Sequence, residues 1–239
     1  MKAIHREALR SVPSMLVSAG IVARFRAKLL GKENIPTDTG VLLVGNHAFM
    51  ALDSVVLGAL LLRETGRIPR WLAERNLFRF PGFRSVLRAW GAIPGEPDHA
   101  VELLSRGELV CVYPGGIDDS FKLRRDKYTL KWQARAGFAR VAMRARVPIV
   151  PLAAVGADDF LEVVAREPWL GRRIFGSARY DIPLAIRGKD LPFEFHALPA
   201  VSTYGDPDDA ADVERVRRQV HDAVDAVLAP HRANRRRAE

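Results

Sequence analysis

The sequence predicts an α/β fold in which a largely parallel mixed sheet carries helices on both faces, preceded by an N-terminal amphipathic basic helix. Three apolar runs, at residues 41–44, 109–113 and 148–155, are short and uninterrupted, which is typical of strands buried on both faces. The segments between them carry helix signals, and alternation of strands with helices favours parallel pairing. With 239 residues, 48% hydrophobic and 27% charged, the chain can bury a core without disulfides or a structural metal.

The N-terminal segment joins a mostly apolar stretch at residues 12–23 to cations on both sides. The stretch is about a dozen residues long, whereas a membrane-spanning helix needs about 20. We expect a helix that continues as a basic helix through Leu30 and either lies in the plane of a membrane or packs on its own domain. A signal peptide is a third interpretation, although no clean cleavage site is present. The flanking cations are Lys2, Arg6, Arg10, Arg24, Arg26 and Lys28.

The remaining elements follow in chain order. The strand at 41–44 ends in Gly45, and the next segment predicts a helix over 53–62 that ends near Arg63 and Gly66. The further elements expected are a weaker strand at 70–73, a helix at 97–106, strands at 109–113 and 148–155 with a helix over 133–145 between them, and strands near 182–186 and 193–197. Valines at three- and four-residue steps then predict an amphipathic helix: Val213, Val216, Val220, Val224 and Val227.

No internal repeat or low-complexity linker divides the chain, so we predict one main domain at 35–230. The amphipathic helical segment at 1–34 precedes it, and a basic tail at 231–239 follows, frayed from Arg232 onward. A single cysteine, Cys111, excludes an intramolecular disulfide framework, and its place inside an apolar run predicts a core residue.

The net charge of +9, from 37 Lys+Arg against 28 Asp+Glu, is compatible with solubility alone, with nucleic-acid binding or with anionic lipid binding. Cations and aromatic rings alternate over residues 75–84 and continue to Arg88 and Trp90, as at a membrane interface, although a solvated surface or single-stranded nucleic acid would also suit them. Because no nucleic-acid motif accompanies this stretch, we expect an anionic membrane surface and no nucleic acid as partner. Further cations could extend this basic face or bind the phosphates of coenzyme A: Arg124, Arg125, Lys127 and Lys131.

Two loops at predicted strand ends carry residues suited to chemistry. Asn46-His47 follows the strand at 41–44, with Asp53 six positions beyond the histidine. A carboxylate can hold a neutral imidazole in the orientation needed to accept a proton, provided that residues 47–52 form a loop before the helix begins. The alternative is that Asp53 merely caps that helix and His47 is an ordinary polar residue. No second histidine or carboxylate stands at ligand spacing from His47, so no metal is predicted.

The second loop contains Pro114-Gly115-Gly116 and follows the strand at 109–113. Adjacent glycines let backbone N–H groups approach a ligand closely, as an oxyanion hole requires, although a plain turn has the same composition. Ligands of open α/β sheets bind beyond the carboxyl ends of strands, so the two loops can share one pocket if their strands are parallel neighbours.

Taken together, four ordered blocks resemble the lysophospholipid/glycerol-phosphate acyltransferase superfamily, over residues 35–225. The blocks are Asn46-His47…Asp53, then Gly91-Ala92-Ile93-Pro94, then Tyr113-Pro114-Gly115-Gly116, then Val147-Pro148-Ile149-Val150-Pro151. The third block, and the continuation of the fourth through Asp158 and Asp159, are most similar to the diacylglycerol-acyltransferase-like and phytyl-ester-synthase-like branch.

The resemblance implies that His47 is the general base and Asp53 its orienting partner, and that amides of Gly115 and Gly116 stabilise the oxyanion. Asn46, Tyr113 and Asp119 are the further residues expected to bind substrate. Five residues separate the histidine from the aspartate where the superfamily usually has four, and Asp119 stands where the branch often has glutamate. Asp119 is therefore either a shorter substitute for that glutamate or a solvated loop carboxylate.

Phosphate-handling members have an arginine where this chain has Asp118, a poor neighbour for a phosphate, which favours a neutral alcohol as acceptor. The expected activity is transfer of a fatty acyl group from acyl-CoA or an acyl carrier protein to a lipid hydroxyl such as a diacylglycerol, lysophospholipid or long-chain alcohol. The expected place is the cytoplasmic face of the cell membrane, as a peripheral protein without a cofactor. The rivals are a hydrolase that uses water in the same pocket and a non-catalytic lipid- or nucleic-acid-binding module.

Overall fold

The computed structural model of the protein describes residues 12–79, 81–167, 169, 173 and 182–236. Its main sheet has seven strands in the order β1-β9-β6-β2-β5-β3-β4, and every neighbouring pair is parallel except β6 with β9. The predicted fold class, a largely parallel mixed sheet, is confirmed. The strands are β1 (Lys28–Leu30), β2 (Val41–Gly45), β3 (Arg70–Ala73), β4 (Ala92–Pro94), β5 (Leu109–Val112), β6 (Ile149–Val155) and β9 (Glu194–Ala197).

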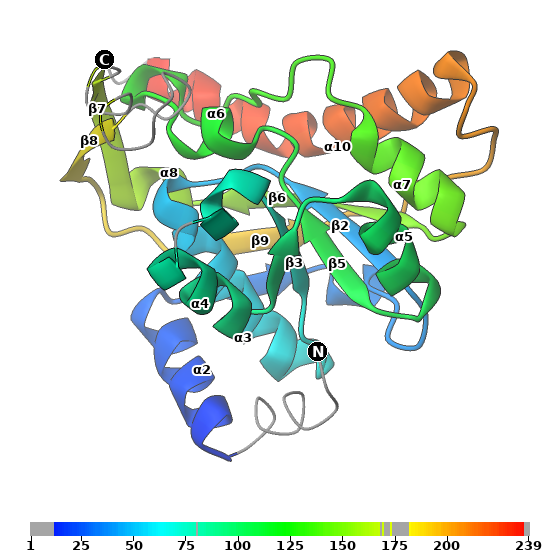
Figure 1. The fold of residues 1–239 in the computed structure, drawn as a ribbon. Helices are drawn as coiled ribbons and strands as arrows, with labels where there is room; N and C mark the ends of the chain where they lie inside the picture. The colour runs from blue at the N-terminus through cyan, green and yellow to red at the C-terminus, as the bar shows by residue number, and fades with distance from the viewer. Residues whose placement is uncertain (1–11, 80, 168, 170–172, 174–181, 237–239) are drawn as a thin grey trace.

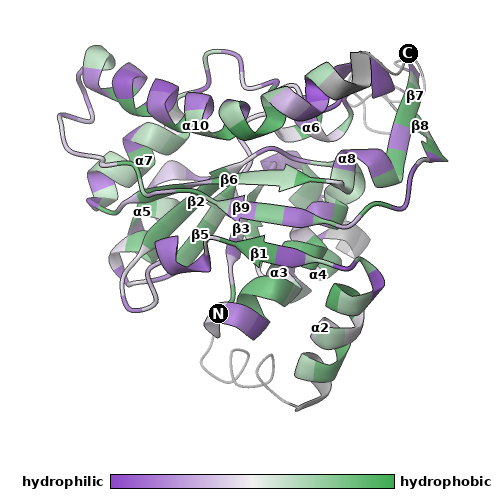
Figure 2. Cartoon of the chain, turned by 180° about the vertical axis from the view of Figure 1, so that it is seen from behind, coloured by the Kyte–Doolittle hydropathy of each residue, from purple (hydrophilic) through white to green (hydrophobic). Residues whose placement is uncertain are grey.

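Helices cover both faces of this sheet (Figures 1 and 2). The apolar run of strand β2 has no polar residue because successive side chains pack into the cores on opposite faces of the sheet. Val41 and Leu43 pack on the side of α2 and α3, whereas Leu42 and Val44 pack on the side of α5, α7 and α10. The helices are α2 (Val12–Arg24), α3 (Leu52–Thr65), α4 (Pro81–Ala89), α5 (Pro97–Ser105), α6 (Gly116–Ser120), α7 (Gly137–Ala145), α8 (Ala157–Phe160) and α10 (Ala210–Arg236).

The C-terminal helix α10 buries four valines of the predicted stripe, Val213, Val216, Val220 and Val224, and Leu228 continues the buried stripe, whereas the predicted Val227 is only partly buried. The expected fraying from Arg232 is wrong as far as Arg236, because the Arg232 guanidinium donates to both carboxylate oxygens of Asp225 and to the Tyr128 carbonyl. The helix expected over 133–145 begins only at Gly137, since Gln133 has a positive φ of 52°.

The N-terminal prediction is half correct. Helix α2 is present, but it ends at Arg24 rather than continuing through Leu30. Arg26 takes a positive φ of 46°, and the Lys28 N–H then donates to the Phe193 carbonyl, so the chain enters the sheet as β1 beside β9. Lys2, Arg6 and Arg10 lie outside the described residues. Within the described ranges, no helix is both long and apolar enough to cross a membrane.

A two-stranded antiparallel ribbon stands apart from the main sheet, formed by β7 (Leu161–Glu167) and β8 (Ile182–Arg187). The strand expected near 182–186 therefore exists but belongs to this ribbon. The sequence analysis predicted neither β7 nor β4. Strand β4 has only three residues, too few to show a periodic pattern. Helix α4, which falls within the basic and aromatic stretch from residue 75 to Trp90, was also not predicted.

Candidate active site

The two predicted loops meet at one edge of the sheet. Strands β2 and β5 are parallel neighbours, with Val44 opposite Val112, so the loops that follow them leave on the same side. His47 follows β2 and Tyr113 follows β5, and their rings stack with centroids 4.1 Å apart at 8°. The expectation that the two loops leave the sheet at the same edge is confirmed.

The His47 imidazole is held by a buried carboxylate. Its Nδ1 lies 2.9 Å from Oδ2 of Asp53, which is fully buried in the first turn of α3. The chain turns back between the two through a 3₁₀ turn, Phe49–Ala51, in which Met50 and Ala51 have φ of 55° and 57°. These two left-handed residues accommodate the five-residue spacing.

Asp53 does not serve as the cap of α3. The N-cap residue is Ala51, and no side chain caps this helix. Oδ1 of Asp53 is buried and accepts no hydrogen bond within the described part of the chain, so the carboxylate is committed to the imidazole.

Tyr113 forms the wall beside the imidazole. Its ring lies between His47 and Trp71, whose ring is nearly parallel at 6.1 Å, and its hydroxyl accepts a hydrogen bond from Ser54 Oγ at 3.3 Å. Burial, together with the nearby Asp53 carboxylate, raises the pKa of Tyr113 well above its usual range. The phenol therefore stays neutral and orients the imidazole by stacking.

The diglycine turn lies between β5 and α6. The Gly116 N–H closes the turn by donating to the Tyr113 carbonyl at 2.9 Å, at a φ of 51°. The Gly115 N–H has no acceptor among the described residues and is the amide of the pair that remains to bind a ligand. A Cβ at Gly115 would lie 2.2 Å from Cγ of Asp119, so no larger residue fits there.

Replacing Gly115 by alanine is expected to destabilise the protein by about 1–3 kcal/mol and to lower activity, because either the turn or Asp119 must move. Gly116→Ala is the matched control. Its Cβ meets nothing within 4 Å, and only the positive φ costs energy, about 1–2 kcal/mol. Thermal unfolding and turnover of both variants check this. Equal loss of activity in the two would contradict a special role for the Gly115 amide.

Asn46 and Asp119, both predicted to bind substrate, have other partners. The Asn46 side chain is buried, accepts from the Ala154 N–H at 2.7 Å and donates to the Ala154 carbonyl at 3.0 Å, which fastens the histidine loop to β6. Asp119 is fully buried, so it is not a solvated loop carboxylate. It accepts from the Lys131 N–H at 2.7 Å and Trp132 Nε1 at 3.1 Å, and burial raises its pKa. Both side chains are therefore engaged by partners within the fold, and their contact with substrate stays a prediction.

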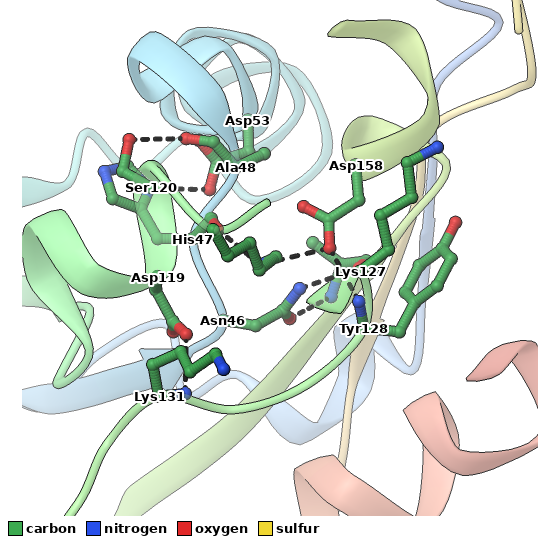
Figure 3. A network of polar contacts seen from close by, with 12 residues as sticks. Asn46, His47, Ala48, Asp53, Asp119, Ser120, Lys127, Tyr128, Lys131 and Asp158 are labelled. Atoms are coloured by element: carbon green, nitrogen blue, oxygen red, sulfur yellow. Dashed lines mark hydrogen bonds and ion pairs between the residues drawn. The ribbon is translucent and has the colours of Figure 1, made fainter. Parts of the chain in front are cut away.

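Lys122 is a site residue that the sequence did not reveal. Its buried ammonium donates to the His47 carbonyl at 2.8 Å and pairs with Asp158 at 3.0 Å. Asp158 also accepts from the Tyr128 N–H (Figure 3). Burial lowers the pKa of Lys122, but the carboxylates of Asp158 and Asp119 outweigh that effect and raise it. Lys122 precedes the cations expected to form a basic face, and only its tertiary pairing distinguishes it from them.

The cations expected to extend a basic face are largely paired within the chain. Lys127 is buried between Asp159, at 2.8 Å, and Glu162, at 2.5 Å. Arg124 also reaches Glu162, at 3.2 Å, and Lys131 pairs with a neighbouring aspartate. The interpretation of Lys127 as part of an exposed basic face is therefore wrong. Among the described residues, no cluster of three or more His, Cys, Asp or Glu could hold a metal ion.

An imidazole held by a buried carboxylate is suited to general base catalysis, which is one way to activate a hydroxyl for acyl transfer. Comparison with known families agrees, since the family model described as Acyltransferase matches residues 26–155. The chain belongs to this acyltransferase family. The superfamily resemblance seen in the four sequence blocks is confirmed.

Individual relatives are similar to this chain over part of their length. A Bos taurus protein named "DGAT1/2-independent enzyme synthesizing storage lipids" is 29% identical over 205 residues, which cover 84% of this chain and 58% of that protein. The Homo sapiens protein of the same name is 34% identical over 122 residues, 51% of this chain and 37% of the relative. The chain thus spans less than two thirds of these relatives.

The fold is similar to that of a solved acyltransferase structure. That structure is the 1-acyl-sn-glycerophosphate (LPA) acyltransferase PlsC of Thermotoga maritima, 20% identical, with a TM-score of 0.52. The superposition covers 94% of this chain and 83% of that chain.

Proposed function

We propose that the protein transfers a fatty acyl group from an acyl thioester, acyl-CoA or an acyl carrier protein, to a lipid hydroxyl. The observation that carries this proposal is the His47–Asp53 pair in a chain of the acyltransferase family. The names of the relatives add support for a lipid acceptor.

In the proposed mechanism, the Asp53 carboxylate accepts the Nδ1–H of His47 and leaves Nε2 as the basic nitrogen. Nε2 takes the proton of the acceptor hydroxyl as its oxygen attacks the thioester carbonyl. The Gly115 N–H donates to the tetrahedral oxyanion, which collapses and expels the thiolate. That thiolate takes the proton from the imidazolium, so base and acid are the same residue.

No covalent acyl-enzyme is part of this mechanism. Cys111, the single cysteine of the chain, is fully buried in β5, and burial raises its thiol pKa. It therefore belongs to the core and does not act as a nucleophile.

An apolar groove of about 280 Å³ supports a long-chain substrate. It lies between α2, α3 and the end of α4, and Trp71 in its wall stacks with the Tyr113 ring, which in turn stacks on His47. We propose that the acyl chain of the donor lies here. Residues that line the groove include Val17, Ile21, Ala59, Leu62, Trp71 and Trp90.

Filling this groove should change chain-length preference. Gly58→Leu places a side chain in the groove beside Trp71, whose Cζ2 lies 3.5 Å from a Cβ at this position. We expect turnover of long-chain thioesters to fall by about tenfold, as for one or two displaced methylene contacts, and that of short-chain thioesters to change little. Arg63→Leu, on the same helix but outside the groove-lining set, is the control. Equal losses for short and long chains would refute this placement.

The acceptor we favour is a neutral alcohol. Arg135, the cation next to the diglycine turn, donates to the carbonyls of Pro114 and Gly115 and pairs with Asp118. Because its charge is already neutralised, it offers little to an acceptor phosphate.

We also propose a peripheral position on the cytoplasmic face of the cell membrane. Helix α2 exposes Met15, Leu16 and Val17, and the surface of α4 carries Val86 between exposed arginines. Within the stretch 75–84, Phe78 packs against the core, so the interfacial character rests on the cations and on α4.

The decisive experiment measures consumption of acyl-CoA and acyl carrier protein thioesters with neutral and phosphorylated acceptors. We expect ester formation with a diacylglycerol or long-chain alcohol. Release of free fatty acid without any alcohol would instead indicate the hydrolase. Vesicle binding without any turnover would indicate the binding module.

A further inference from the structure

The β7–β8 ribbon carries three large apolar side chains that are about half exposed. Val164, Leu184 and Ile186 are 46%, 50% and 47% exposed. Leu184 and Ile186 alternate with half-buried Ala185 and therefore project from one face of the ribbon, while Val164 lies at a register irregularity of β7. Large side chains gathered on a separate ribbon mark an interaction surface rather than incidental exposure.

This ribbon is adjacent to the active site. Val163 of β7 is fully buried and forms a bridge with Leu123, one residue after Lys122. A small pocket between Phe49, in the loop that follows His47, and Val163 adjoins the same strand. A surface that binds the ribbon therefore lies close to the proposed acceptor hydroxyl.

A cationic cluster joins the ribbon to α2. Asp190, just after β8, faces three arginines: Arg24 at 3.5 Å, Arg26 at 3.7 Å and Arg187 at 3.6 Å. All three guanidinium groups are about half exposed or more, and Arg24 and Arg187 both lie over the Phe160 ring. Three positive charges against one carboxylate leave an excess that suits phosphate head groups.

The ribbon and α2 lie on the same side of the molecule, at the left of Figure 1 and at the right of the reversed view in Figure 2. Figure 2 also shows apolar residues on both elements. We infer that the ribbon is a second membrane contact, which inserts Val164, Leu184 and Ile186 among lipids while the arginine cluster binds anionic head groups. This inference rests on the lipid function proposed above and adds a surface that α2 alone does not supply.

The test is co-sedimentation of the full chain with phosphatidylcholine vesicles, with and without phosphatidylglycerol, in the absence of substrate. Leu184→Ser with Ile186→Ser should weaken binding to both vesicles by about tenfold, since two exposed apolar side chains lose insertion. Arg26→Gln with Arg187→Gln should weaken binding by about tenfold only where phosphatidylglycerol is present.

Matched controls are available on surfaces remote from the ribbon. Tyr204, 89% exposed, lies in the connection between β9 and α10, which Figure 1 places on the opposite side of the molecule. Arg218, on α10, is as exposed as the cluster arginines. Tyr204→Ser and Arg218→Gln should bind vesicles like the parent chain.

The inference would be overturned if the ribbon variants bound vesicles like these controls while the single change Leu16→Ser, on α2, abolished binding. Conversion of a dimer into a monomer by the ribbon variant, seen in sedimentation equilibrium, would also overturn it and assign the ribbon to a second copy of the chain. Turnover of a short-chain thioester and a soluble alcohol, measured without vesicles, tests the proposed function separately. The ribbon variant should retain that turnover.

Discussion

Replacing His47 by alanine should lower acyl transfer by about 10³-fold or more, since general base catalysis typically supplies 10²–10⁴-fold. The loss should appear in kcat with every donor and acceptor, because the imidazole acts on the hydroxyl and not on the acyl chain. Asp53→Asn should cost about 10²-fold or more, because an amide can offer its NH₂ group to Nδ1 and favour the wrong tautomer.

The His47→Ala variant must be assayed well below its unfolding temperature, since removal of the imidazole also leaves the buried Asp53 carboxylate without its partner. Added free imidazole should restore part of the turnover of His47→Ala but none of that of Asp53→Asn. His99→Ala, a histidine of α5, is the control. If His47→Ala kept more than a tenth of parental turnover, another group would have to be the base.

Replacing Lys122 by methionine should destabilise the protein more than Gly115→Ala does. The change leaves the Asp158 carboxylate buried without its counter-ion and the His47 carbonyl without its donor. Breaking a buried ion pair from one side costs about 3–5 kcal/mol. Urea unfolding should show this loss as a lower midpoint, and turnover should fall because the loop that carries His47 loosens.

A double variant separates charge from packing. Lys122→Met with Asp158→Asn removes both charges, while the amide oxygen introduced by the second change can still accept the Tyr128 N–H, so part of the lost stability should return. Lys122→Arg should keep the charge and restore some turnover. A double variant as unstable as the single one would show that the charge pair is not the cause.

Much of this fold could be predicted because the apolar residues of each buried strand or helix repeat at the spacing of that element. The run at 41–44 is apolar without a break since both faces of β2 are covered, and the valines of α10 repeat at helical spacing because one stripe of the helix is buried. Gly115 and Gly116 indicated a turn with accessible amides for an equally local reason. His47 and Asp53 could be named, but whether they meet could not be settled.

Tertiary structure decided the remainder, because the deciding contacts join residues far apart in sequence. The left-handed Met50 and Ala51 bring Asp53 to His47, which no helical period predicts. No sequence pattern singled out Lys122, which pairs with Asp158 and donates to the His47 carbonyl, and none showed that the Asn46 amide pairs with Ala154. A polar side chain takes its role from the partners it meets on burial, and those partners are fixed only when the sheet assembles.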